Sequence, residues 1–340
     1  MTRSYQVLIS TSLRSGKRVD GHGEEVSGSL LLGTIDTRAR CYRLIKQVEV
    51  PQSSHRRGRN SVRGIARFGD GFAVCNTTQL FLYDRNLERI TGTYSEKRFG
   101  DIHSLAVREE VVYVTATASD SIIGLDRDLT RVFEWWAGSE PELARYMNEH
   151  PRQATMWDHD FRMKGGYWNR FHINHAFFDG NGDMIVNLPN IEVGPGVTKF
   201  WNVTRREFHL AGSAELNPID GRIHDGIILD GYHYLGRTED GSFIKLCKES
   251  GRLVQSVDCR VPLGETTGNP IAIRHGWLRG ATHLDDEVFL VGQSRLTLFL
   301  VDMQRGIRSE PLEMVGMPTS VNHPGLAIYC IEKLPDPDLP

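Results

Sequence analysis

Histidine and arginine recur in this sequence at corresponding places, each at the start of a short apolar segment. His103 opens the segment that runs to residue 107, and His224 opens the one that runs to residue 228. Arg63 and Arg279 hold the same place in two further segments, and a glycine follows each of them. Neutral imidazoles bind transition metals, and guanidinium groups bind carboxylate or phosphate through paired hydrogen bonds. These residue types together predict a site for a small anionic molecule beside a metal ion.

A third histidine comes from the segment at residues 171–175, which holds two. Aligning this segment on the hairpin that follows it puts His175 at the level of His103 and His224. The other register puts the preceding residue there, with His172 on the same strand face. A shift of one residue reverses which side chains share a face, so both histidines are kept. We therefore predict a divalent transition metal (Zn, Fe or Cu) held by His103, His224 and one of His172 or His175.

Catalytic roles are predicted for three residues beside this metal. Arg63 and Arg279 would fix the anion and stabilise negative charge that develops on it. His323 would be a fourth ligand or an acid–base group, and Asp225 would orient a histidine from behind. Substrate-binding roles at the mouth of the site are predicted for Trp157, His159, Trp168 and Arg170.

Each of these residues also has a structural interpretation. A histidine that begins a strand is most often a hydrogen-bonded structural residue, and the aromatic residues can simply pack on neighbouring elements. Recurrence at one position in several segments is what favours a shared site. Histidines that bind an anion directly, or that only line a water-filled channel, are the alternatives to metal binding.

A repeat in the sequence predicts how these segments are arranged. Asp84–Ile90 matches Asp126–Val132, and the two copies begin 42 positions apart, which is typical of one four-stranded propeller blade. Gly69-Asp70-Gly71, between two apolar runs, predicts a tight hairpin. The acidic run Asp179–Asp183 resembles part of a calcium loop, but the later Glu is missing, so a hairpin fits better.

The repeats predict an all-β fold, a six-bladed β-propeller with a short helical and aromatic insertion. Five blades begin near Arg63, His103, Asn174, His224 and Arg279. The sixth is shared between the strand at Tyr5–Ser10 and the tail Asn322–Cys330, which supplies the innermost strand and closes the ring. We expect one domain over residues 1–334, with the insertion at 138–169 over one face and a tail at 335–340. The opening residues of the blades then meet at a central tunnel.

Composition limits the classes of function. Forty Lys and Arg against 43 Asp and Glu give a net charge of −3, which argues against a nucleic-acid-binding protein. The basic run His55–Arg59 is interpreted as a solvated loop. Five cysteines without a CxxC spacing predict free thiols in a reducing compartment. An apolar run long enough for a membrane span and a signal core are both missing, so we expect a cytoplasmic protein that binds no membrane.

Several short motifs together resemble the DUF4915 group, a family of propeller-like bacterial proteins. The motifs are Ile9-Ser10-Thr11, Arg63-Gly64-Ile65-Ala66, Ile102-His103-Ser104-Leu105-Ala106, His172-Ile173-Asn174, Arg279-Gly280-Ala281 and Phe289-Leu290-Val291-Gly292. His175 stands where that pattern has Gly, which favours His172 as the residue that faces the tunnel. The resemblance implies the architecture, and it brings no reaction with it.

The function predicted from these observations is a metal-dependent enzyme acting on a small anionic molecule in the tunnel. A lyase, isomerase or cyclase is favoured because no nucleotide or dinucleotide motif indicates redox chemistry. An iron-dependent oxygenase is the alternative within the enzyme class. A non-catalytic binding module for a protein or sugar partner is the alternative outside it.

Overall fold

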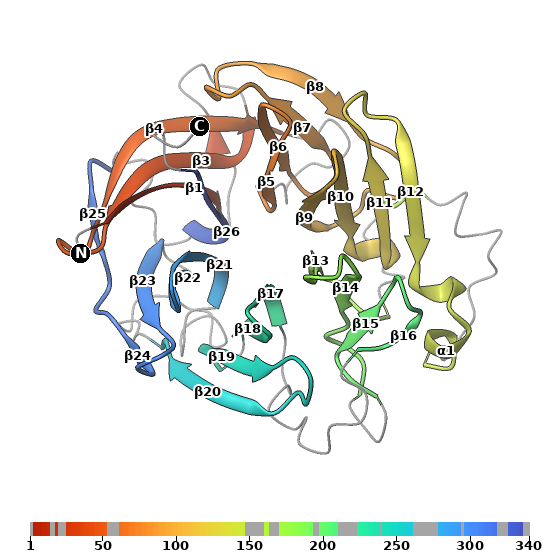
Figure 1. Cartoon of the computed structure of the whole chain (residues 1–340). Coiled ribbons are helices and arrows are strands. Elements are labelled where there is room, and N and C mark those ends of the chain that lie inside the picture. The colour runs from red at the N-terminus through yellow and green to blue at the C-terminus, as the bar shows by residue number, and fades with distance from the viewer. Residues whose placement is uncertain are drawn as a thin grey trace, which may run out of the picture.

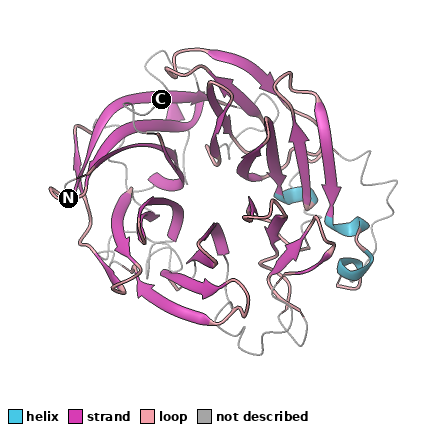
Figure 2. Cartoon of the chain, in the orientation of Figure 1, coloured by secondary structure: helices cyan, strands magenta, loops and turns pink. Residues whose placement is uncertain are grey.

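Short strands form six sheets that stand around a common axis (Figure 1). The computed structural model describes residues 3–13, 18–19, 25–52, 61–146, 160–162, 170–192, 197–209, 223–238, 240–260, 278–293, 296–317 and 326–335. Strands make up nearly all of the regular structure in these residues (Figure 2). The predicted six-bladed β-propeller is confirmed. Within the described residues, no helix is both long and apolar enough to span a membrane.

Five of the sheets have four antiparallel strands each, in chain order from the axis outward. They are β5 (Ile65–Phe68), β6 (Gly71–Cys75), β7 (Leu80–Tyr83) and β8 (Ile90–Tyr94); β9 (Ile102–Arg108), β10 (Val111–Ala116), β11 (Ser121–Leu125) and β12 (Arg131–Trp136); β13 (Ala176–Phe178), β14 (Met184–Asn187), β15 (Phe200–Asn202) and β16 (Glu207–Phe208); β17 (Ile223–Leu229), β18 (Tyr232–Arg237), β19 (Ser242–Cys247) and β20 (Leu253–Asp258); and β21 (Leu278–Asp285), β22 (Val288–Gln293), β23 (Thr297–Asp302) and β24 (Ile307–Arg308).

The predicted hairpins have the expected turn chemistry. Gly69 joins β5 to β6 with a φ of 57°, a conformation that glycine adopts without steric cost. The Asp126 carboxylate accepts the backbone N–H groups of Asp128 and Thr130 between β11 and β12. Asp179 does the same for Asn181 and Asp183 between β13 and β14. These acidic residues therefore shape turns, as the sequence predicts.

The sixth sheet joins the two ends of the chain. It contains β1 (Ser4–Leu13), β2 (Arg18–Val19), β3 (Glu25–Asp36), β4 (Cys41–Pro51), β25 (Glu313–Val315) and β26 (Leu326–Lys333). β26 lies innermost and pairs antiparallel with β1, so the predicted closure by the C-terminal segment is confirmed. β25 was not predicted; it pairs parallel with β4 at the outer edge. The chain after β24 thus closes both edges of this blade.

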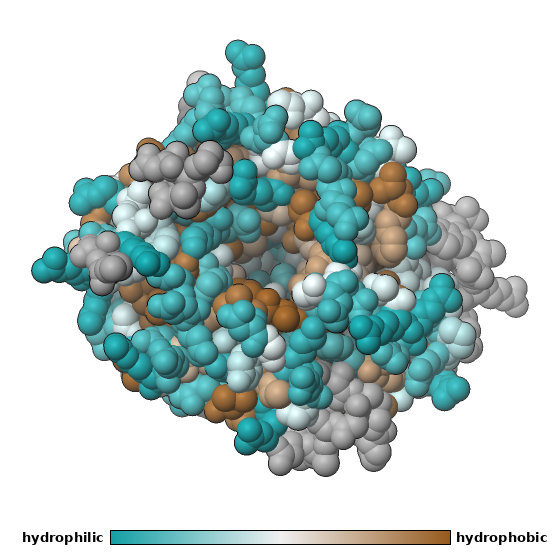
Figure 3. Space-filling model, in the orientation of Figure 1, coloured by the Kyte–Doolittle hydropathy of each residue, from teal (hydrophilic) through white to brown (hydrophobic). Residues whose placement is uncertain are grey.

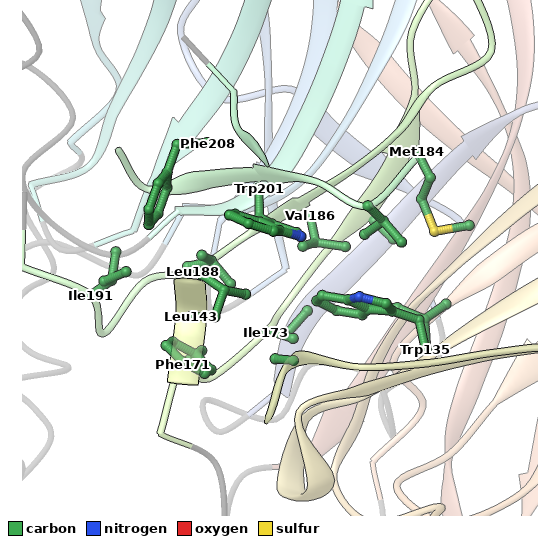
Figure 4. Packing of buried hydrophobic residues seen from close by; sticks show 14 residues of the cluster. Trp135, Leu143, Phe171, Ile173, Met184, Val186, Leu188, Ile191, Trp201 and Phe208 are labelled. Carbon is green, nitrogen blue, oxygen red and sulfur yellow. The ribbon is translucent and has the colours of Figure 1, made fainter. Parts of the chain in front are cut away.

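Apolar side chains fill the space between neighbouring blades. Between the blades of β9–β12 and β13–β16, Trp135, Trp201 and Phe208 form a layer together with aliphatic side chains (Figure 4). Leu143 of α1 (Pro141–Ala144) joins that layer. The first part of the predicted insertion therefore packs at the rim beside β12 and β16 (Figure 1). Phe161, also in the insertion, is buried against Ala118 and Trp136.

The closure should carry a large share of the stability. Ile331 of β26 is 3% exposed, whereas Ile45 of β4 in the same blade is 55% exposed. Ile331→Ala removes buried methyl groups from the seam and should cost about 3 kcal/mol of the free energy of unfolding. Ile45→Ala is the matched control and should cost less than about 0.5 kcal/mol. Equal losses for the two variants in denaturant titrations would show that the seam is not a stabilising element.

Candidate functional site

Three of the four candidate metal-binding histidines meet at the axis. His103 lies in β9, His224 lies in β17, and His172 lies just before β13 in the blade between them. The ring centroids of His103 and His172 are 5.4 Å apart, and those of His103 and His224 are 5.8 Å apart. The ring of blades therefore brings to His103 two imidazoles that lie 69 and 121 positions further along the sequence.

The turn that presents His172 is fixed from both sides. Phe171 and Ile173 are buried in the apolar layer of Figure 4, so the side chain between them points away from it, to His103. His172 has a φ of 56°, which is uncommon for a residue with a Cβ. The buried Asp120 carboxylate accepts the backbone N–H groups of Phe171 and Ile173 at 3.1 and 3.3 Å. Burial raises the pKa of Asp120 to about 7, and these N–H groups act against that shift.

His175 lies outside this cluster. Its ring stacks on Phe177, and its Nε2 lies 3.2 Å from the backbone oxygen of Gly226. A carbonyl oxygen only accepts, so Nε2 carries the proton and donates. The register ambiguity in the sequence arose because His172 belongs to a turn and not to the strand. Strand β13 begins only at Ala176, so alternation cannot be extended back to His172.

The two candidate arginines lie beside two of the histidines. Arg63 places Nη1 2.8 Å from Nε2 of His103, and Arg279 places Nη2 3.4 Å from Nε2 of His224. Arg63 also donates from Nε to Ser61 and from Nη2 to the Asp101 carboxylate. Each half of the site is therefore a guanidinium paired with an imidazole.

Tyr329 of β26 was not predicted as a site residue. The guanidinium carbons of Arg63 and Arg279 lie 4.8 and 4.5 Å from its ring centroid. Contacts of this length are cation–π interactions. The residue could have been found from the sequence, because Asn322–Cys330 was expected to form the innermost strand of the closing blade. Because the innermost strand of a blade borders the axis, an aromatic residue on that strand is a candidate site residue.

Hydrogen bonds define the protonation state of His103. Guanidinium groups only donate, so Nε2 accepts from Arg63 and the ring proton resides on Nδ1. Nδ1 lies 2.8 Å from both the Asp101 backbone oxygen and the Thr117 hydroxyl. That hydroxyl donates onward to the backbone oxygen of Ile173, so it accepts from His103. The ring is held in one tautomer by Arg63 of the preceding blade and by Asp101 and Thr117 of its own blade.

Burial and the arginines keep both histidines neutral. Burial, followed by the charge of Arg63, holds the pKa of His103 well below its usual range. Burial and the charge of Arg279 do the same for the pKa of His224. The pKa of Asp225 is shifted in the opposite direction, because burial raises it to about 6. The Gly280 N–H, which donates to Asp225 at 2.8 Å, and the charge of Arg279 both act to lower that pKa. Two imidazole lone pairs thus face two fixed positive charges.

The described residues contain no group of three His, Cys, Asp or Glu side chains placed to hold a metal ion. In this arrangement the Nε2 lone pair of His103 accepts a hydrogen bond from Arg63. Of the remaining candidates, Arg170 is exposed. His323, Trp157, His159 and Trp168 lie outside the described residues.

Comparison with solved structures supports the architecture alone. A protein of unknown function from Bacteroides caccae matches over 98% of this chain and 100% of its own length, with 11% identity and a TM-score of 0.57. Virginiamycin B lyase from Staphylococcus aureus with quinupristin matches over 76% of this chain and 71% of its own, with 12% identity and a TM-score of 0.45. The second value is too low to carry an argument. The sequence matches no family model and no curated protein, so the resemblance to the DUF4915 group stays a prediction.

Removing one guanidinium should change the titration of its histidine. In ¹⁵N-histidine NMR spectra, His103 and His224 should stay neutral from pH 8 to pH 5. Arg63→Gln removes the second-largest cause of the shift at His103, so the pKa of that ring should rise. Arg67→Gln, four positions along the same segment and exposed, should leave it unchanged. Titration of His103 near its ordinary pKa in the unmodified protein would contradict the geometry.

Proposed function

We propose that the protein is an enzyme that binds a small anionic molecule at the propeller axis and moves a proton on it. Arg63 and Arg279 bind the anion, and His103 or His224 accepts the proton. The observation that supports this best is that each neutral imidazole has Nε2 next to a guanidinium. The site thus contains two pairs, each with a potential base and an anion-binding group in hydrogen-bond contact.

The anion itself would activate the base. A carboxylate or phosphate that takes the hydrogen bond of Arg63 Nη1 releases Nε2 of His103 from that guanidinium. Its negative charge also offsets the positive charge that holds down the pKa of the imidazole. The histidine pKa then moves toward the operating pH, where a general base is most effective. The Nδ1 hydrogen bonds to Asp101 and Thr117 keep the ring aimed during this change.

A lyase, isomerase or cyclase reaction follows from such a pair. The imidazole Nε2 takes a proton from the carbon next to the bound carboxylate, and the C–H electron pair becomes an enolate. The guanidinium groups stabilise the added negative charge on the enolate oxygens. Return of the proton to another carbon gives isomerisation, loss of a group from the neighbouring carbon gives elimination, and attack on an internal electrophile gives ring closure.

A metal-dependent form of this proposal is the second candidate. It is supported by the spacing of the three rings of His103, His172 and His224, with centroids 5.4 and 5.8 Å apart. A divalent transition metal bound to them would polarise a substrate oxygen or activate water, and iron would open oxygenase chemistry. Metal binding would require His103 Nε2 to give up its hydrogen bond from Arg63. An arriving anion would break the same hydrogen bond.

Metal content separates the two forms. The metal-dependent form predicts close to one equivalent of Zn, Fe or Cu in protein purified without chelator, and loss of it in His103→Gln and His224→Gln. Less than about a tenth of an equivalent excludes that form and leaves acid–base chemistry. His283→Gln is the control, because His283 lies near the end of β21, where its Nε2 donates to the backbone oxygen of Asp286. Metal that remains in both axial variants would belong to another site.

Anion affinity should depend on pH through Asp225. Its pKa is about 6, so it is ionised above that pH and partly offsets the charge of Arg279, and it is neutral below. Sulfate keeps its charge across this range and should therefore bind more tightly as the pH falls from 8 to 5. Asp225→Asn should bind at all pH values as the wild type does near pH 5, and Arg279→Gln should lose about ten-fold in affinity at every pH.

Calorimetry with sulfate, and with small carboxylates and phosphate esters, provides the readout. If none of these anions binds, the axis is not an anion site. Binding of a protein or sugar that persists unchanged in the Arg279→Gln and His103→Gln variants would instead favour the non-catalytic module.

A further inference from the structure

A cavity of about 470 Å³ lies along the same inner strands that carry the arginine–histidine pairs. It is lined by residues 65–67 of β5, 105–107 of β9, 175–178 at β13 and Glu332 of β26. Arg63 and His103 each stand two positions before the first lining residue of their strand. At a rise of about 3.3 Å per residue, the first lining residues lie roughly 7 Å along the strand from the backbone of Arg63 and of His103. The space-filling view shows a hollow at the centre of the ring (Figure 3).

The walls of this cavity are mostly apolar. Ile65, Leu105 and Phe177 contribute large side chains, and Ala106 and Ala176 leave room between them. A cavity of this size with apolar walls and few polar groups is typical of a small-molecule site. The far end of the axis thus differs in kind from the end that holds the arginines.

Two polar side chains of the cavity, His175 and Glu332, are wholly or partly uncharged at neutral pH. Burial lowers the pKa of His175 to about 4, so its ring is neutral. Burial raises the pKa of Glu332 to about 7, against the charge and the backbone N–H of Arg67, so this carboxyl is about half protonated at pH 7. Arg67, whose guanidinium is positively charged, also lines the cavity, but its side chain is exposed to solvent. The buried part of the lining therefore suits an apolar or uncharged group.

We infer that the substrate is amphipathic: its anionic end binds at Arg63 and Arg279, and its apolar end fills the cavity between β5, β9 and β13. This inference rests on the proposed function. It gives His175 a new role, as part of the wall that receives the apolar end. It also narrows the substrate class to carboxylates or phosphates that carry a ring or an alkyl chain of several carbons.

A series of straight-chain carboxylates from acetate to octanoate tests the inference by calorimetry. Each methylene that enters the cavity should raise the affinity about three- to four-fold until the cavity is full. Ala106→Leu places extra carbon atoms in the cavity and should flatten that dependence on chain length. Ala144→Leu in α1, far from the axis, is the matched control and should leave the dependence unchanged. Arg279→Gln should weaken every member of the series by a similar factor.

The outcomes separate this inference from the proposed function. If short and long carboxylates bind with equal affinity, the axis is an anion site and the apolar cavity is not part of it. If no carboxylate and no sulfate binds, the proposed function fails as well. The inference is overturned if the dependence on chain length is unchanged in Ala106→Leu, because the alkyl chain then binds outside this cavity. It is also overturned if Arg279→Gln leaves the affinities of the series unchanged. Ala106→Leu that still binds sulfate is folded at the axis, so a flat series in it counts as support.

Discussion

The pairing of β26 with β1 is the interaction on which the rest of this structure depends. Blades of a propeller cover their sheet faces only against the next blade, so an open row of six would leave two faces exposed. The strand from the C-terminal part of the chain removes those ends. It also places β26 between β21 and β5, which is why Tyr329 lies against Arg279 on one side and Arg63 on the other. The closure that stabilises the ring therefore also completes the site.

The cation–π contacts of Arg63 and Arg279 with the Tyr329 ring are not sufficient to stabilise two partly buried guanidinium groups. A cation–π contact contributes about 0.5–2 kcal/mol, which is small beside the cost of burying a charge. Asp101 supplies a carboxylate to Arg63 at 3.1 Å, and Asp225 supplies a second carboxylate near Arg279. The neutral imidazoles accept hydrogen bonds without adding charge. Because the histidines are acceptors here, the same contacts that stabilise the arginines also favour the neutral form of the imidazoles.

The sequence predicted the fold well because each blade contains turn and hairpin patterns that can be recognised within a short stretch of sequence. The hairpin at Gly69–Gly71, the repeated turns at Asp84 and Asp126, and the closing tail all depend on residues that are close in sequence or equivalent by repeat. β25 escaped prediction because a parallel pairing between β25 and β4 leaves no turn and no alternation that marks it. A three-residue strand is also too short to show a pattern.

Prediction of the site was limited by contacts that no local pattern encodes. His172 reaches the axis because Asp120, 52 positions earlier, binds the turn that holds it. That contact crosses between blades, so strand alternation favoured neither His172 nor His175. The pairing of Arg63 with His103 likewise joins neighbouring blades, and it uses the lone pair that a metal would need. Residue types indicated which groups would meet; only the fold shows which atom faces which.

The length of the inner strands sets the reach of the molecule that the axis can hold. Arg63 lies two residues before β5, which begins at Ile65, and Arg67 lies two residues after Ile65. On β26, Tyr329 and Glu332 bracket the same span. Arg63 and Tyr329 lie at the first level, and the cavity, with the Glu332 carboxyl whose pKa burial raises to about 7, lies at the next. If the axis binds the proposed anion, a ligand that reached both levels would be charged at one end and apolar at the other.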